Sequence, residues 1–122
     1  MKMTKSKIDL EKRTLAFGLV TLKMLRGVPS GVEFKSIRRQ LTHSATAIGA
    51  LYREANRTVS QSDYVCRLAA VQKAAVETEF WLSLIEGLEE RIPGVGAIHE
   101  EAMELVEIFN RLRQTAENSV KE

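Results

Sequence analysis

The sequence predicts an all-α protein that folds as one antiparallel, up-down-up-down four-helix bundle over residues 1–122. Four segments repeat apolar residues at steps of three and four, which places those residues on one face of a helix. Short runs rich in Gly, Pro or capping residues separate the segments, and short loops make consecutive helices antiparallel. No run alternates long enough to predict a sheet. The four helices are expected at residues 8–26, 34–56, 61–90 and 97–118.

The first helix is predicted to begin near Ile8 and to end at Arg26, before a loop over residues 27–31. Its core face is expected to carry residues at heptad-like spacing, namely Ile8, Leu15, Leu19 and Leu22. In the loop, Ser30 and Glu33 have the spacing of a capping box, which would satisfy the free N–H groups at the start of the second helix.

The second helix is predicted to bury one stripe, made of Ile37, Leu41, Ser44, Ile48, Tyr52 and Ala55. Small residues accompany this stripe, and Gly49 in mid-helix costs about 1 kcal/mol relative to Ala. We therefore expect another helix backbone to approach closely there. A turn over residues 56–59 follows, and Ser60 with Asp63 predicts a cap for the third helix.

The third and fourth helices have the most regular patterns. The third repeats steps of four and three through Tyr64, Leu68, Val71, Ala75, Thr78, Leu82 and Ile85. Two more apolar stripes flank it, so this helix is expected to be central in the domain or shared with another subunit. After a break over residues 91–96, the fourth helix carries Ile98, Ala102, Leu105, Phe109, Leu112 and Ala116 on one stripe.

Composition predicts a cytoplasmic protein with an uneven charge distribution. One cysteine excludes an internal disulfide, and neither a signal peptide nor an apolar membrane span is recognisable. Residues 1–61 carry 12 Lys and Arg against 4 Asp and Glu, whereas residues 62–122 carry 6 against 12. The basic part would either contact an anionic partner or pack beside the acidic part, within or between subunits.

Two strings in the sequence resemble a known family. They are Ser44-Ala45-Thr46-Ala47-Ile48-Gly49-Ala50 and Glu77-Thr78-Glu79-Phe80-Trp81-Leu82. Together they resemble the bacterial four-helix-bundle proteins encoded by intervening sequences of large-subunit ribosomal RNA genes, over residues 8–115. The resemblance implies a ring-shaped homopentamer, with an architecture similar to the accessory protein of diversity-generating retroelements. Leu51 and Ala74 stand where many relatives have Asn and Glu, so a shared polar site would be incomplete.

No motif predicts an enzyme, a cofactor or a metal site. Gln40 and Gly96 stand three residues before His43 and His99, where a di-iron bundle would place Glu. Cys66 lies off the core stripe of the third helix and has no signature of a paired base. Glu79 lies near the edge of that stripe, where an ion pair with Arg38 is expected rather than a general base.

The remaining candidate site is a basic stripe on the outer face of the second helix. Its members fall within about 40° of one another on a helical wheel, and they are Lys35, Arg39, Arg53 and Arg57. Such a stripe is a solvated face, a surface that pairs with an acidic neighbouring subunit, or a phosphate-binding surface.

These observations lead to two functional expectations. The first is a non-enzymatic, homo-oligomeric assembly protein, a pentamer by resemblance, with Phe80 or Trp81 as the interface anchor. Its partners would be its own copies and another protein. The second is a nucleic-acid-binding accessory protein that uses the basic stripe.

Overall fold

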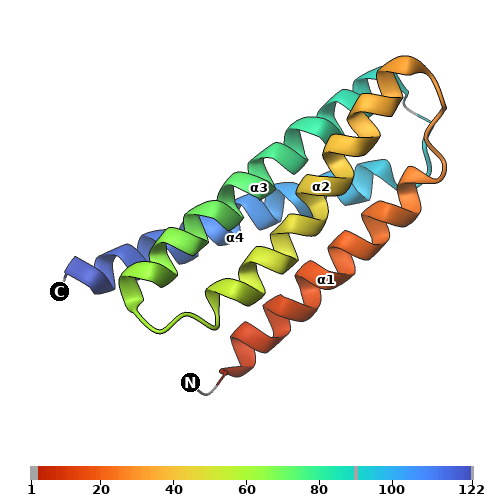
Figure 1. The fold of residues 1–122 in the computed structure, drawn as a ribbon. Helices are drawn as coiled ribbons and strands as arrows, with labels where there is room; N and C mark the ends of the chain where they lie inside the picture. The colour runs from red at the N-terminus through yellow and green to blue at the C-terminus, as the bar shows by residue number, and fades with distance from the viewer. Residues whose placement is uncertain (1–2, 90, 122) are drawn as a thin grey trace.

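The computed structural model describes residues 3–89 and 91–121 and contains four long helices, shown in Figure 1. They are α1 (Lys5–Leu25), α2 (Val32–Ala55), α3 (Gln61–Leu88) and α4 (Val95–Lys121). The helices alternate in direction, so the two ends of the chain lie at the same end of the bundle (Figure 1). The predicted all-α four-helix bundle is confirmed. Residue 90, the predicted last residue of the third helix, lies outside the described residues.

One of the two predicted helix caps is present. The Ser60 hydroxyl accepts a hydrogen bond from the backbone N–H of Asp63, at 3.1 Å, and so caps α3 as expected. The predicted capping box of Ser30 and Glu33 is wrong, because α2 has Gly31 as its N-cap and no side-chain cap bond. Ser30 stands one residue too early for its hydroxyl to reach the first turn.

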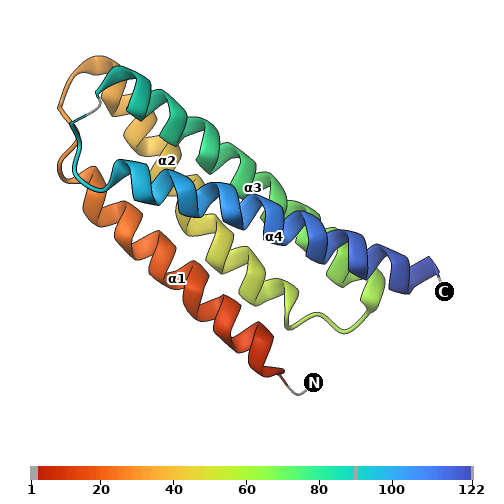
Figure 2. The same ribbon diagram turned by 180° about the vertical axis from the view of Figure 1, so that it is seen from behind.

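The predicted core stripes of α2, α3 and α4 are buried. Of the residues predicted on these stripes only Tyr64 and Leu112 remain half-buried. At the centre, the rings of Tyr52 and Phe109 meet edge to face with their centroids 5.2 Å apart. α3 packs against both α2 and α4 (Figure 2), which confirms its expected central position in the domain.

The predicted core face of α1 is wrong. Leu15 is 59% exposed, Leu19 54% and Leu22 38%, and Ile8 is exposed as well. The face that packs against the bundle carries instead Glu11, Thr14, Phe17, Gly18, Thr21, Met24 and Leu25. α1 is therefore apolar on two faces, and the more hydrophobic of them points away from the core.

Close helix packing explains why α1 buries its small and polar face. A Cβ atom added at Gly49 of α2 would lie 3.3 Å from Oγ1 of Thr14, so the predicted close approach at Gly49 is confirmed. The hydroxyls of Thr14 and Thr21 donate to backbone carbonyls one turn earlier, the Thr21 bond to Phe17 measuring 2.8 Å. These threonines can therefore be buried without leaving an unsatisfied donor.

α1 is the peripheral helix of the bundle. Its main neighbour is α2, and it contacts α4 over a short stretch only, as Figure 2 shows. In the part of the chain that the structure describes, the backbones of α1 and α3 do not come into contact. None of the described helices is both long and apolar enough to cross a membrane.

Candidate interaction surfaces

The exposed leucines of α1 line a groove between α1 and α2. On the α1 side the groove is formed by Leu15, Leu19 and Leu22, and on the α2 side by small residues that include Thr46 and Ala50. Its volume is about 330 Å³. Small residues on α2 leave room beside the leucines, so the groove is both apolar and open. We call the surface formed by Leu15, Leu19, Leu22, Thr46 and Ala50 the α1–α2 groove.

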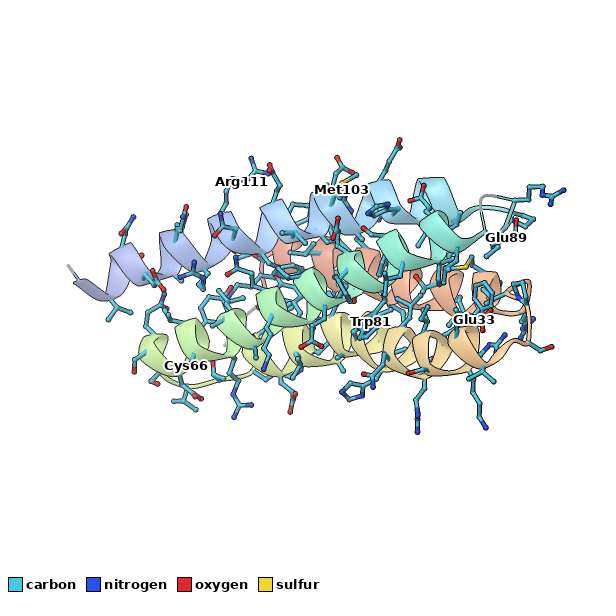
Figure 3. All side chains as sticks on the ribbon, turned by 90° about the horizontal axis from the view of Figure 1, so that it is seen from above. Glu33, Cys66, Trp81, Glu89, Met103 and Arg111 are labelled. Atoms are coloured by element: carbon cyan, nitrogen blue, oxygen red, sulfur yellow. The ribbon has the colours of Figure 1, made fainter. Side chains whose placement is uncertain are left out.

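α3 carries a second exposed apolar surface. Val76, Phe80 and Leu84 follow one another at steps of four, and they are 49%, 52% and 37% exposed. We call these three residues the α3 ridge. The ring of Trp81 meets that of Phe80 edge to face, with the centroids 5.0 Å apart. Trp81 itself is half-buried where α3 lies against α2 (Figure 3).

The two predicted interface anchors therefore differ in their surroundings. Phe80 projects into solvent and is available to a partner, whereas Trp81 supports the Phe80 ring from the side. Beside the ridge, Met103 of α4 is 45% exposed and lines a shallow hollow with Val76 and Glu107. Figure 3 shows Met103 on the outer side of α4. The apolar surface thus continues from α3 onto α4.

The predicted basic stripe divides into a free part and a paired part. Lys35 and Arg39 are exposed on α2, and neither forms an ion pair with any residue that the structure describes. Arg57, in the turn after α2, places Nη1 2.9 Å from Oε2 of Glu11, and Nε of Arg53 lies 3.9 Å from Oε1 of the same carboxylate. Half of the stripe thus already neutralises an acidic residue of α1.

Glu11 is buried where α1 meets the end of α2. Its Oε2 atom also accepts a hydrogen bond of 3.0 Å from Nδ2 of Asn56. Burial alone would raise the pKa of Glu11, but the hydrogen bonds from Arg57 and Asn56 and the nearby guanidinium charges lower that pKa below its usual value. The carboxylate therefore stays ionised and fastens α1 to α2.

The predicted pair between Glu79 and Arg38 is wrong. Arg38 donates from Nη2 to the backbone carbonyls of Val28, at 2.8 Å, and Pro29, at 3.1 Å. It thereby braces the loop between α1 and α2. Glu79 points instead toward α4, where Oε1 lies 3.1 Å from Nε2 of His99.

His99 forms a polar cluster that joins α3 to α4. Its Nδ1 atom contacts the carboxylate of Glu86, and its Nε2 atom contacts Glu79 and, at 3.2 Å, the Ser83 hydroxyl. Burial would lower the pKa of His99, but the two carboxylates raise it above its usual value. His99 is thus half-buried between the two helices.

The other residues considered from the sequence are not brought together. His43 and Cys66 are both exposed, on α2 and α3. Within residues 3–89 and 91–121 no group of three His, Cys, Asp or Glu side chains has an arrangement that could hold a metal ion. Ala74 is buried, and its carbonyl oxygen lies 2.7 Å from the Thr78 hydroxyl, which also contacts Ser44 at 3.0 Å.

The charge imbalance of the sequence corresponds to two sides of the molecule. Arg13 of α1 binds Glu101 and Glu104 of α4, with its Nη2 atom 2.7 Å and 2.9 Å from their carboxylates. Other acidic residues of α4 remain exposed, and among them Glu100 and Glu107 border an open hollow of about 710 Å³. The α1–α2 side is basic and the α3–α4 side acidic, and only part of this charge is paired within the chain.

The fold defines the chain as an all-α four-helix-bundle protein with two exposed apolar surfaces. No model of a known family and no curated protein matches it. A solved structure does: a protein of unknown function from the S23 ribosomal protein family of Bacteroides thetaiotaomicron. The TM-score is 0.73, the sequences are 24% identical, and the match covers 84% of this chain and 96% of the other. At this identity the likeness shows a common fold.

Proposed function

We propose that this chain is a non-enzymatic assembly protein that forms a homo-oligomer through its exposed apolar surfaces. The observation that carries the proposal is the outward-facing row of Leu15, Leu19 and Leu22. Three large aliphatic side chains in a groove resemble an interface rather than ordinary surface, because contiguous exposed apolar patches mark interaction sites. The family resemblance adds the number of subunits, a ring of five. The broad apolar surface of α3 suggests that the ring recruits another protein, and the composition suggests that it does so in the cytoplasm.

Measurement of mass in solution tests this proposal. Light scattering or sedimentation of the wild-type chain should give five times the subunit mass of 13.7 kDa. Leu19→Ser should lower that mass, while Val59→Ser, which changes a 97% exposed residue in the turn before α3, should not. A single subunit mass across micromolar concentrations would reject self-assembly.

A second candidate function is binding of nucleic acid by the basic stripe. Lys35 and Arg39 are free to contact phosphates, and a ring would repeat them on every subunit, which raises avidity. The similar solved structure belongs to a family named for a ribosomal protein, and this motivates RNA as the first nucleic acid to test. Arg53 and Arg57 would contribute less, since each also faces Glu11.

Retention of RNA and DNA at about 50 mM salt tests this candidate, because phosphate contacts are strongest at low salt. Affinity should fall with a log–log slope of about −0.7 to −0.9 per phosphate contacted. Lys35→Glu combined with Arg39→Glu should abolish retention, whereas Arg111→Glu on the acidic side should leave it unchanged. Absence of retention by the wild-type oligomer would reject this candidate and leave self-assembly untouched.

A further inference from the structure

We propose that the α1–α2 groove of one chain receives the α3 ridge of a second copy, so that subunits join head to tail. The inference rests on the proposed self-association and names the two surfaces that meet. It is carried by the geometry of those surfaces and by the charges around them.

The groove and the ridge agree in length and in shape. Leu15 to Leu22 extends about 10 Å along α1, and Val76 to Leu84 extends about 12 Å along α3, at 1.5 Å per residue. The ridge is convex, with Phe80 exposed at its centre, and the groove is a hollow beside leucines. An aromatic ring in an apolar hollow is the usual centre of an interface.

Their positions in the fold keep the two surfaces from meeting within one chain. The described parts of α1 and α3 make no backbone contact, so the ridge cannot cover the groove of its own chain. Pairing of two α1 helices would leave Phe80 exposed, and pairing of two α3 helices would leave Leu19 exposed. Head-to-tail contact covers both surfaces on every subunit, and such an interface generates a closed ring when the rotation closes.

Charge complementarity favours the same pairing. On α2, Arg53 lines the groove, and Arg39 lies on the same helix face two heptads earlier. The ridge is bordered by Glu77 and, beside Val76, by Glu107, with Lys73 as an exposed cation nearby. A groove facing another groove would oppose Arg to Arg, whereas a groove facing a ridge opposes Arg to Glu.

Two variants, each lacking one surface, test the inference. Leu19→Asp blocks the groove and keeps the ridge, and Phe80→Asp blocks the ridge and keeps the groove. Both residues are more than half exposed, so circular dichroism should show an unchanged fold. Each variant alone should be monomeric. A 1:1 mixture should form a dimer of twice the subunit mass, because one intact groove and one intact ridge remain.

Labelling identifies the surfaces in that dimer. With ¹⁵N in the Leu19→Asp chain, unlabelled Phe80→Asp chain should shift amide resonances around Phe80, and with the labels exchanged it should shift those around Leu19. Val59→Asp, outside both surfaces, should assemble like the wild type. The inference is overturned if the wild type assembles but Phe80→Asp does so equally well, or if the mixture remains monomeric. A monomeric wild type would instead overturn the proposed function.

Discussion

At the scale of single residues, two polar clusters join neighbouring helices. Glu11 joins α1 to Asn56 and Arg57 at the end of α2. Glu79 and Glu86 of α3 enclose His99 of α4. In both clusters, burial opposes the charged form and charged partners restore it, so each cluster should give stability a recognisable dependence on pH.

Replacing Glu11 by Gln should lower the free energy of unfolding by about 1–3 kcal/mol, because a hydrogen-bonded charge is lost from a buried position. The lowered pKa of Glu11 fixes the sign of the pH effect. Its stabilisation is present above the unfolded pKa of about 4.3 and is lost as the pH falls through the folded pKa. Urea titrations at several pH values measure this. Asp9→Asn, at an exposed position of α1, should change stability by less than about 0.5 kcal/mol.

Titration of His99 should give the free energy of unfolding the opposite dependence on pH. Since its pKa is raised, its stabilisation is fully present below the unfolded pKa of about 6.5 and is lost as the pH rises through the folded pKa. His99→Gln should remove this pH dependence and lower the free energy of unfolding by up to about 1 kcal/mol near pH 6. The value is modest because the side chains of Glu79 and Glu86 are more than a third exposed to solvent. NMR titration of the imidazole should give a pKa above 6.5. A slope that survives in His99→Gln but disappears in His43→Gln would contradict this assignment.

At the scale of helices, α1 and α3 use their apolar residues differently. α3 buries its most regular stripe except for the half-buried Tyr64, with Leu68 and Leu82 at 0% exposure. α1 buries threonines, a glycine and a carboxylate together with Phe17, and it exposes three leucines. The same kind of heptad spacing therefore forms the core in one helix and an exposed surface in the other.

Paired substitutions measure this difference. Leu82→Ala should cost about 2–5 kcal/mol, because it leaves a cavity in the core. Leu19→Ala should change the stability of the isolated subunit by less than about 0.5 kcal/mol, because Leu19 is 54% exposed. Denaturant unfolding at low protein concentration compares the two. A loss of several kcal/mol for Leu19→Ala under those conditions would mean that the groove is closed within the subunit.

At the scale of the whole molecule, α2, α3 and α4 pack most extensively, and α1 lies at the edge of the bundle. α3 lies between α2 and α4, whereas α1 depends on α2 and on a few contacts with α4 (Figure 1). A helix with fewer neighbours opens at lower free energy than a central one. Assembly through the α1–α2 groove would add the neighbour that α1 lacks.

Amide hydrogen exchange should reveal this difference in local stability between α1 and the central helix α3. In a dilute sample that is monomeric, amides of α1 should exchange faster than those of α3, through an opening that leaves α2, α3 and α4 folded. At concentrations where the chain assembles, exchange in α1 should slow more than exchange in α4. Equal protection of all four helices in the monomer would show that α1 unfolds only with the rest of the bundle.

The sequence correctly predicted most of the fold. Apolar stripes located the buried faces of α2, α3 and α4, and Ser60 marked the start of α3. Phe80 and Trp81 were singled out as large aromatic residues on a helix that is apolar around more of its circumference than one seam requires. The same reasoning applied to α1, where Phe17, Met24 and Leu25 lie off the leucine row, would have revealed two apolar faces and hence the groove.

By itself, the sequence determined that this chain forms four helices in an alternating bundle, because spacing along one helix defines which side chains share a face. Only the tertiary structure decided which face of α1 is buried, because that choice depends on Thr14 and Gly49 allowing two backbones to approach. It also decided the partners of Glu11 and His99, since ion pairs between helices depend on register and rotation. Periodicity within one helix contains no information about how closely two backbones approach or about which side chains of two helices meet.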